Sequence, residues 1–282
     1  MSEAIIQLQG PLPEFQDFLR STIRTIINDH IEKAVFSIAK NISERWRFIS
    51  ASALVKNTRK EVHGEDFADC AFLPLACGIS DATVFIGIRD KSFSDFFRKF
   101  KDALEENLNL ACSIKSILIK DPLSGLFNSG YFDECAERLF HEKKLSALAF
   151  IDIDKFKTVN EKYGHKLGNA LIVSFGSFLK EQLSKDMAAF RYGGDEFAII
   201  FNGLEKTEVM RYLDNLILEC AMTEFSCCEY HEKVSISISS GCSFSPDSFK
   251  NASAMLSAAE KAMFAAKKDG GGKLFCLPHD KI

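Results

Sequence analysis

The chain has 282 residues, of which 46% are hydrophobic and 26% are charged, and its formal net charge is -4. This length predicts about two domains with enough chain to bury a core, and the composition is that of an ordinary soluble globular protein. The slightly acidic balance excludes the strong basic field that nucleic-acid-binding proteins use, so we expect no nucleic acid as a partner.

Neither a targeting segment nor a membrane span is readable in the sequence. The first ten residues, MSEAIIQLQG, lack a basic start and a long apolar stretch. No apolar run approaches the roughly 20 residues that cross a bilayer. Nine cysteines, without paired C-x-x-C spacings, favour reduced thiols over a disulfide framework. We therefore expect a cytoplasmic protein that does not associate with a membrane.

The N-terminal third predicts a small α+β domain. Apolar residues recur at three- and four-residue steps from residue 13 to about residue 50, which is typical of a helix. Two apolar runs, 70–76 and 82–88, predict strands joined by a hairpin connection over 78–81. This stretch loosely resembles the last strands of a GAF domain. We expect residues 1–92 to form a sensory or regulatory domain.

Residues 93–118 carry apolar side chains that alternate four- and three-residue steps. Over about three and a half heptads, such spacing predicts the seam of a coiled coil, and the polar Asn107 within it would favour one register and a dimer. An amphipathic helix packed on its own domain has the same pattern, so both interpretations stay open. The seam positions are Phe93, Phe97, Phe100, Leu104, Asn107, Ala111, Ile114 and Leu118.

Beyond residue 118, strands and helices alternate in a way that predicts a second domain, 119–282, around one sheet. The turn-rich stretch 121–132 leads to the unbroken apolar run 148–151, which is typical of a strand covered on both faces. The later predicted elements are helices over 156–163 and 171–183, a hairpin around Gly193 and Gly194, a helix over 207–220, a strand over 234–240 and a helix over 253–267.

The segment RYGGDEF, residues 191–197, raises the question of a cation site. Paired glycines are typical of a hairpin turn, because glycine accepts positive φ angles at no steric cost. The adjacent carboxylates of Asp195 and Glu196 repel each other unless a cation or a proton separates them. Asp152 stands where an apolar strand ends, and an unpaired acid there is expensive. If the two strands are neighbours, Asp152 and Asp195 meet at one sheet edge, a donor set that suits Mg²⁺ with water and substrate phosphates.

Four blocks in this region occur in the order and spacing of the GGDEF-domain diguanylate cyclases. They are DPLSGLFN (121–128), DIDKFKTVNEKYGHKLGN (152–169), RYGGDEF (191–197) and AEKAMFAAKKDG (259–270). On these blocks, the region from about Lys115 to Lys273 is identified as a member of that family. The resemblance implies a nucleotidyl-cyclase or palm-like α+β fold, in which helices flank a mostly antiparallel central sheet.

The resemblance also implies the chemistry. Two GTP molecules would be joined into cyclic di-GMP with loss of pyrophosphate, in a homodimer whose domains each bind one GTP. Mg²⁺ or Mn²⁺ would be held by Asp152, Asp195 and the backbone carbonyl of Ile153. The role of Glu196 stays open between metal ligand and acceptor of the 3′-hydroxyl proton.

Further residues would bind the substrate. Free amides near Lys155 and Phe156 would cradle the phosphates at the start of a helix. Lys157 and Lys267 would neutralise the triphosphate, and Asn160 resembles a guanine-reading residue. The other substrate-side residues of the matching blocks are Asn169, Arg191, Gly193 and Gly194.

The chain departs from the family pattern at several positions. Asn169 replaces the usual aspartate that accepts hydrogen bonds from guanine, and an amide beside a guanine edge loses one such bond. Relaxed selectivity, with ATP as a second substrate and cyclic GMP-AMP as a product, is therefore open. Ser129 and Gly271 replace arginines, which leaves open a GTP-binding regulatory module without turnover. In the family, an inhibitory site for the product begins with an R-x-x-D motif shortly before the hairpin. Residues 184–187 stand there and do not match the motif, so we expect no product inhibition through that site.

Overall fold

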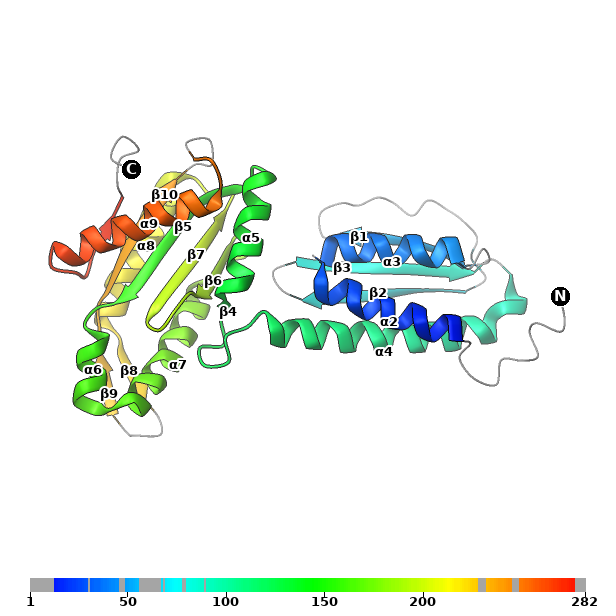
Figure 1. The fold of residues 1–282 in the computed structure, drawn as a ribbon, viewed down its shortest axis with the longest axis horizontal. Coiled ribbons are helices and arrows are strands. Elements are labelled where there is room, and N and C mark those ends of the chain that lie inside the picture. The colour runs from blue at the N-terminus through cyan, green and yellow to red at the C-terminus, as the bar shows by residue number, and fades with distance from the viewer. Residues whose placement is uncertain are drawn as a thin grey trace. The chain divides into compact units, whose positions relative to one another are not determined.

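The computed structural model describes residues 13–29, 31–45, 49–55, 67, 69–77, 80–88, 90–227, 232–244 and 249–276. The chain forms two compact units, Met1–Leu118 and Ile119–Ile282 (Figure 1). None of the helices in the described part of the chain is long and apolar enough to cross a membrane.

The first unit packs helices on a three-stranded antiparallel sheet of order β1-β3-β2. Its two predicted strands are confirmed as the paired β2 and β3, whereas β1 was not expected from the sequence. Residues 78–79 of the predicted hairpin connection lie outside the described residues. The elements are α2 (Pro13–Asn28), α3 (Ile31–Arg45), β1 (Ile49–Val55), β2 (Asp69–Cys77), β3 (Ser80–Ile88), the 3-10 turn η1 (Lys91–Phe93) and α4 (Ser94–Leu118).

The helical pattern that runs from residue 13 to about residue 50 is divided between two helices, and its end belongs to β1. Asn28 is the last residue of α2 and Asp29 follows it, and both are weak helix formers. The carbonyl of Asp29 accepts a hydrogen bond of 2.5 Å from the ammonium of Lys115 on α4, a residue that is 4% exposed. A buried ammonium group therefore satisfies a backbone carbonyl just after the end of α2.

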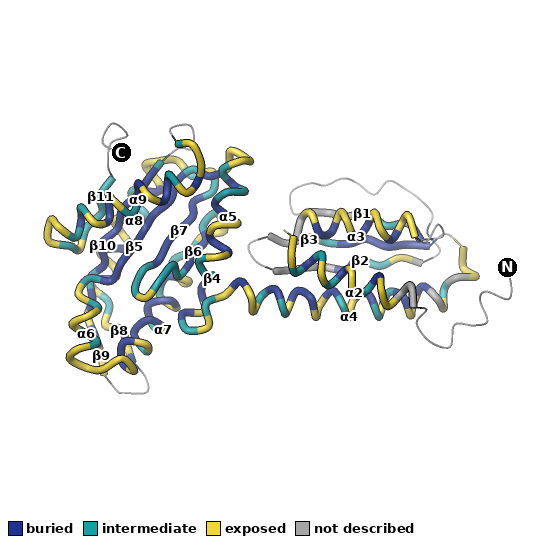
Figure 2. Tube along the Cα trace, in the orientation of Figure 1, coloured by how far each residue is buried: buried dark blue, intermediate teal, exposed yellow. Residues whose placement is uncertain are grey.

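Helix α4 packs on its own unit over most of its length, which is the second of the two interpretations of the seam. Phe97, Phe100, Leu104 and Ala111 are buried in the core that α2, α3 and the sheet form (Figure 2). The amide of Asn107 donates to the carbonyl of Ala103 within the helix, at 2.8 Å. These buried positions are not free to form a seam with a second helix.

The second unit is built on a six-stranded sheet of order β11-β10-β5-β7-β6-β4, whose four central strands are antiparallel. The outer strands β11 and β4 pair in parallel with β10 and β6. Helices flank the sheet, so the predicted fold class is confirmed. The elements are β4 (Phe127–Asn128), α5 (Ser129–His141), β5 (Leu145–Ile153), α6 (Phe156–Tyr163), α7 (His165–Gln182), β6 (Met187–Arg191), β7 (Glu196–Asn202), α8 (Lys206–Met222), β8 (Glu224–Cys227), β9 (Glu232–Ser235), β10 (Ile238–Phe244), α9 (Ala252–Lys268) and β11 (Leu274–Phe275).

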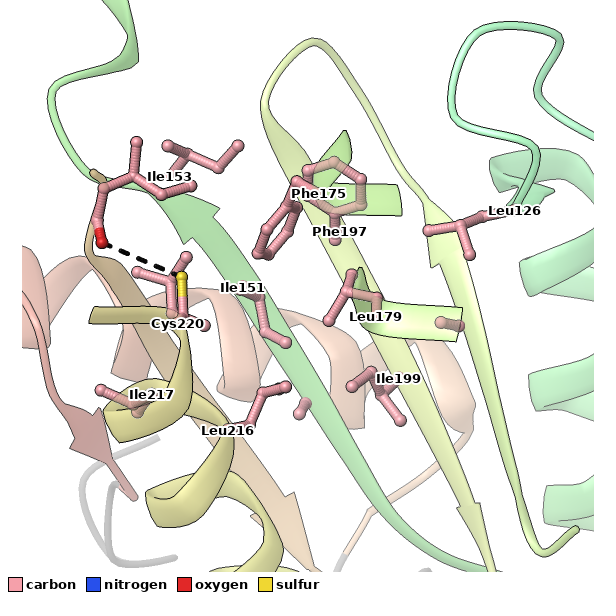
Figure 3. Close-up of a cluster of buried hydrophobic side chains, with 14 of the residues drawn as sticks. Leu126, Ile151, Ile153, Phe175, Leu179, Phe197, Ile199, Leu216, Ile217 and Cys220 are labelled. Atoms are coloured by element: carbon pink, nitrogen blue, oxygen red, sulfur yellow. Dashed lines mark hydrogen bonds between the residues drawn. The ribbon is translucent and has the colours of Figure 1, made fainter. Parts of the chain in front are cut away.

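The central strands are buried on both faces, which explains their unbroken apolar sequence. On one face, α7 and α8 cover Ile151, Ile153 and Ile199 (Figure 3). On the other face, α5 and α9 cover Leu148 and Phe150. Because side chains alternate along a strand, Asp152 belongs to the α9 face.

Two parts of the second unit differ from the prediction. The stretch 234–240 is not one strand, because the chain leaves β9 after Ser235 and enters the central sheet as β10 at Ile238. Between them, Ser237 turns its carbonyl to the amide of Asp154, at 2.9 Å. The second difference is α5, which begins inside the predicted turn and is capped by the side chain of Asn128.

Candidate active site

The acids of the DID and GGDEF segments meet at one end of the central sheet. Asp152 of β5 lies opposite Glu196 of β7 in the antiparallel register, so both side chains leave the same face. The amide of Ile153 donates to the carbonyl of Asp195 at 3.3 Å. The two strands are thus neighbours, as the sequence pattern required for a shared site.

Asp152 is a buried acid beside one cation and two other acids. It is 6% exposed, and its Oδ1 forms an ion pair with the ammonium of Lys267 on α9. No other hydrogen-bond donor reaches this oxygen among the described residues. Burial raises the pKa of Asp152 to about 6, the Lys267 ammonium lowers it, and the charges of Asp195 and Glu196 raise it. A bound cation would relieve this electrostatic cost.

The two glycines of the hairpin do not adopt positive φ angles, contrary to the expectation for a tight turn. A Cβ atom on Gly193 would lie 2.7 Å from Oε2 of Glu196, so the absent side chain makes room for this carboxylate. A Cβ atom on Gly194 would meet nothing within 4 Å. Gly194 therefore faces open space at the tip of the turn, where a ligand can approach the backbone.

Arg191 stabilises the hairpin through hydrogen bonds. Its guanidinium donates to the carbonyl of Gly194 at 2.7 and 3.1 Å and to Asp121 at 3.1 and 3.3 Å. Burial raises the pKa of Asp121, but hydrogen bonds from Ser124 and the charge of Arg191 outweigh it and leave this pKa below its ordinary value. These bonds occupy the side chain that the sequence pattern assigned to substrate binding.

Helix α6 presents its first amides beside the end of β5. Lys155 takes a left-handed conformation, with φ of 56°, and turns the chain into the helix. The first helical hydrogen bond is donated by Thr158 to the carbonyl of Lys155, so the amides of residues 155–157 have no helical partner. The side chain of Lys157 is 90% exposed and lies 3.8 Å from Glu161. This helix start can accept an anion.

The two asparagines assigned to base reading lie on adjoining helices. Asn160 of α6 is partly buried, and its side chain lies over Gly168 of α7, where any Cβ atom would collide with it. Asn169 follows on α7 and is exposed. The glycine therefore fixes how closely the Asn160 amide approaches α7.

Asp154 is a structural residue of the site that sequence reasoning missed. Its carboxylate accepts from the hydroxyls of Ser237 and Ser239, at 2.7 and 2.6 Å, and from the amide of Gly272 at 2.9 Å. It thus ties the turn after β5 to β10 and to the loop after α9. The sequence signal that could have pointed to Asp154 is its place as the second acid of the DID segment, two residues after Asp152.

Glu260, on α9, is the second site residue that sequence reasoning missed. It lies two helical turns before Lys267 on the same helix face. Burial raises the pKa of Glu260, and the charge of Glu196 raises it further. Helix α9 thus adds both a cation and an acid to this end of the sheet.

The acidic end of the sheet offers carboxylate and carbonyl oxygens to a divalent cation. In the part of the chain that the structure describes, no group of three or more His, Cys, Asp or Glu side chains is arranged to hold a metal ion. The paired acids with a nearby backbone carbonyl nevertheless fit Mg²⁺, which usually takes one or two carboxylates and fills its shell with water and phosphate oxygens.

Comparison with known proteins identifies the second unit. The family model described as "Diguanylate cyclase, GGDEF domain" matches residues 118–273. The response regulator PleD of Caulobacter vibrioides is 27% identical over 194 residues, which are 67% of this chain and 40% of PleD. Diguanylate cyclase TpbB of Pseudomonas aeruginosa is 30% identical over 158 residues, which are 54% of this chain and 36% of TpbB. The chain thus spans less than half the length of these relatives.

A solved structure shares the fold. The coiled coil and GGDEF domain of DgcB from Caulobacter crescentus, in complex with c-di-GMP, superposes with a TM-score of 0.58 at 24% identity. The match covers 66% of this chain and 100% of that one. Since the family model spans more than half of the residues, the chain belongs to the GGDEF-domain diguanylate cyclase family.

Proposed function

We propose that the chain is a diguanylate cyclase, which condenses two GTP molecules into cyclic di-GMP and releases pyrophosphate. The observation that carries the proposal is the convergence of Asp152, the Asp195 turn and Lys267 at one sheet end, beside the free amides of α6. Relatives named diguanylate cyclases support it. We place the reaction in the cytoplasm, which supplies GTP.

The substrate would lie across the ends of β5 and β7. Its triphosphate would accept hydrogen bonds from the amides of residues 155–157, with Lys157 free to move onto it. Its base would lie toward Asn160 and Asn169. Gly194, which leaves space at the turn, would let the sugar and phosphates pass close to the backbone.

Asp152, Asp195 and the carbonyl of Ile153 would hold a divalent cation, Mg²⁺ or Mn²⁺. When bound, this ion supplies positive charge at the α-phosphate and the leaving pyrophosphate. Lys267 would then exchange its contact with Asp152 for phosphate oxygens. Glu196 would either complete the metal shell or accept the proton of the attacking hydroxyl.

The reaction needs two domains that face each other. The 3′-oxygen of one GTP attacks the α-phosphorus of the other, a new P–O bond forms, the bond to the bridging oxygen breaks and pyrophosphate leaves. A second, identical step closes the ring. Exposed apolar side chains at the end of α4 support a homodimer: Leu110, Ile117 and Leu118 are 51%, 76% and 57% exposed and share one helix face. Ile117→Asp should shift the protein toward monomer in analytical ultracentrifugation.

The first unit is proposed as the regulatory domain. Its core includes most of α4, and α4 runs directly into Ile119 of the cyclase unit. A signal that repacks this core would therefore act on the helix that precedes the catalytic domain. The predicted GAF-like character of this unit stays a prediction.

Two alternatives rest on particular residues. Asn169 favours relaxed base selectivity and a mixed cyclic GMP-AMP product, and Ser129 with Gly271 favours GTP binding without turnover. Purified protein should be incubated with Mg²⁺ and GTP, ATP or both, and the products identified by mass spectrometry. Cyclic di-GMP that disappears in Asp195→Ala supports the cyclase. Bound but unconverted GTP would reject the cyclase in favour of the binding module.

A further inference from the structure

Two cysteines directly follow the last paired positions of β10 and β11 at the sheet edge. Strands β10 and β11 pair in parallel, with Ser240 opposite Leu274 and Gly241 opposite Phe275. The next position on each chain is a cysteine, Cys242 on β10 and Cys276 directly after β11. Adjacent strands are about 4.8 Å apart, within the Cα separation that a disulfide spans.

Packing brings the two thiols to the same face. Cys242 is part of the buried core under α8, and Cys276 packs against that core while partly exposed. The thiol of Cys242 donates to the carbonyl of Ser243 at 3.8 Å. The sulfur of Cys276 also lies 3.4 Å from Sδ of Met210 on α8. Both sulfurs therefore border the same core, beside α8.

The surroundings favour a reactive thiolate on Cys276. The neighbouring Cys242 thiol lowers the pKa of Cys276, burial raises it, Lys206 lowers it and Asp214 raises it, with a net lowering. Lys206 lies at the same end of β10, 5.1 Å from the ring centre of Phe244. Burial raises the pKa of Cys242, which therefore remains the thiol partner.

We propose that Cys242 and Cys276 form a peroxide-responsive pair that closes to a reversible disulfide between β10 and the segment after β11. The Cys276 thiolate attacks a hydroperoxide, so that an S–O bond forms, the O–O bond breaks and, after protonation, water or an alcohol leaves. The Cys242 sulfur then attacks the sulfenic sulfur, the S–S bond forms and the S–O bond breaks. The Cys242 proton leaves with the oxygen as water. Both thiols are oxidised and the peroxide is reduced.

The disulfide would lie close to the glycine loop, residues 270–272 after α9. Only Lys273 and β11 separate Cys276 from Gly272, whose amide donates to Asp154. The carbonyl of Lys273 also accepts from the amide of Ser240 at 3.0 Å. The bond would hold β11, and with it the glycine loop, against β10.

The test uses the full, reduced chain treated with hydrogen peroxide. We expect a peptide pair linked through Cys242 and Cys276 in a non-reducing digest, and a rise in the Tm of the second unit of about 5–10 °C. Amide exchange across residues 270–276 should slow, and dithiothreitol should reverse all three changes. Cys135→Ser, which alters a buried cysteine on the opposite face of the sheet, should behave like the natural chain.

Two variants make the test specific. Cys276→Ser changes a partly exposed residue and should lose the Tm rise, as should Cys242→Ala. A Tm rise that persists in Cys276→Ser would overturn the proposal. So would oxidation of Cys276 to sulfinic acid while Cys242 stays a free thiol. None of these readouts depends on nucleotide turnover, so the proposal can fail while the cyclase assignment stands.

Discussion

Asp152 of β5 and Lys267 of α9 form an ion pair in which the carboxylate is almost wholly buried. The pair does not compensate for burial, because the pKa of Asp152 is still raised to about 6. In the metal-free protein near pH 8, the ionised form of Asp152 therefore reduces stability. The acids at this end of the sheet suit the binding of a cation, and they lower the stability of the metal-free protein.

Asp152→Asn should stabilise the metal-free protein while it abolishes turnover. The stability that protonated Asp152 contributes is fully present below about pH 4 and is lost as the pH rises through about 6. The variant should therefore gain about 1–3 kcal/mol in the free energy of unfolding near pH 8 and gain nothing near pH 4. Calorimetry at both pH values measures the difference.

Asp154→Asn is the matched control for that experiment. Asp154 accepts hydrogen bonds from two serines and the Gly272 amide, so its amide variant should be destabilised at both pH values. If Asp152→Asn were also destabilised near pH 8, the ion pair with Lys267 would outweigh burial, and the electrostatic account would be wrong.

Lys267→Met should move the pH dependence of the reaction as well as its rate. Loss of the ammonium removes a cause that lowers the pKa of Asp152, so the acidic limb of the rate profile should shift to higher pH. We expect turnover to fall about 100-fold or more, as for other groups that stabilise developing charge. Lys268→Met, at the exposed neighbouring position, should leave both rate and profile unchanged. Equal effects of the two variants would argue against a specific role for Lys267.

The two hairpin glycines should respond differently to alanine. At Gly193 the new Cβ atom would press on the carboxylate of Glu196 at 2.7 Å, so Gly193→Ala should displace that acid and reduce turnover with a small loss of stability. At Gly194 there is open space and no positive φ angle, so Gly194→Ala should leave the Tm unchanged. A rise in the KM for GTP in Gly194→Ala would then report on ligand approach. An unchanged KM would mean that GTP does not pass this side of the turn.

Much of this site was predictable because its signals are local. The apolar run before Asp152 and the acids after Gly194 mark two strand ends, and neighbouring strands bring them together. The position of Asp154 two residues after Asp152 was a signal, but its partners on β10 and in the glycine loop were not predictable, since they are distant in the sequence. For the same reason, the break between β9 and β10 at Ser237 could not be read from an alternating pattern.

The seam of α4 shows a different limit. Heptad spacing records only that one face of a helix is apolar, and it does not record what covers that face. In this chain, the core of the first unit covers Phe97, Phe100 and Leu104. The apolar residues left exposed, such as Ile117, lie toward the end of the helix.

Asn169→Asp tests the origin of base selectivity. Asn169 is exposed in the first turns of α7, so the change should affect stability by less than about 0.5 kcal/mol. A carboxylate can accept from both donors on the guanine edge, so the preference for GTP over ATP should rise about 10-fold or more. Competition between the two nucleotides in one reaction measures it. If the natural chain already fails to use ATP as a substrate, Asn169 does not relax the selectivity for guanine.

Gly271→Arg should fail to restore the arginine that the family usually has in this loop. Gly271 has a φ of 74°, and a Cβ atom there would lie 3.0 Å from both carboxylate oxygens of Asp154. The strained backbone alone costs about 1–2 kcal/mol, and displacement of Asp154 would release the amide of Gly272. We expect a lower Tm and no gain in turnover. Ser129→Arg, at the first residue of α5, has no such conflict and should be tolerated within about 0.5 kcal/mol. A stable and more active Gly271→Arg would show that the loop can rearrange away from Asp154, and the missing arginine would then account for any weak activity of the natural chain.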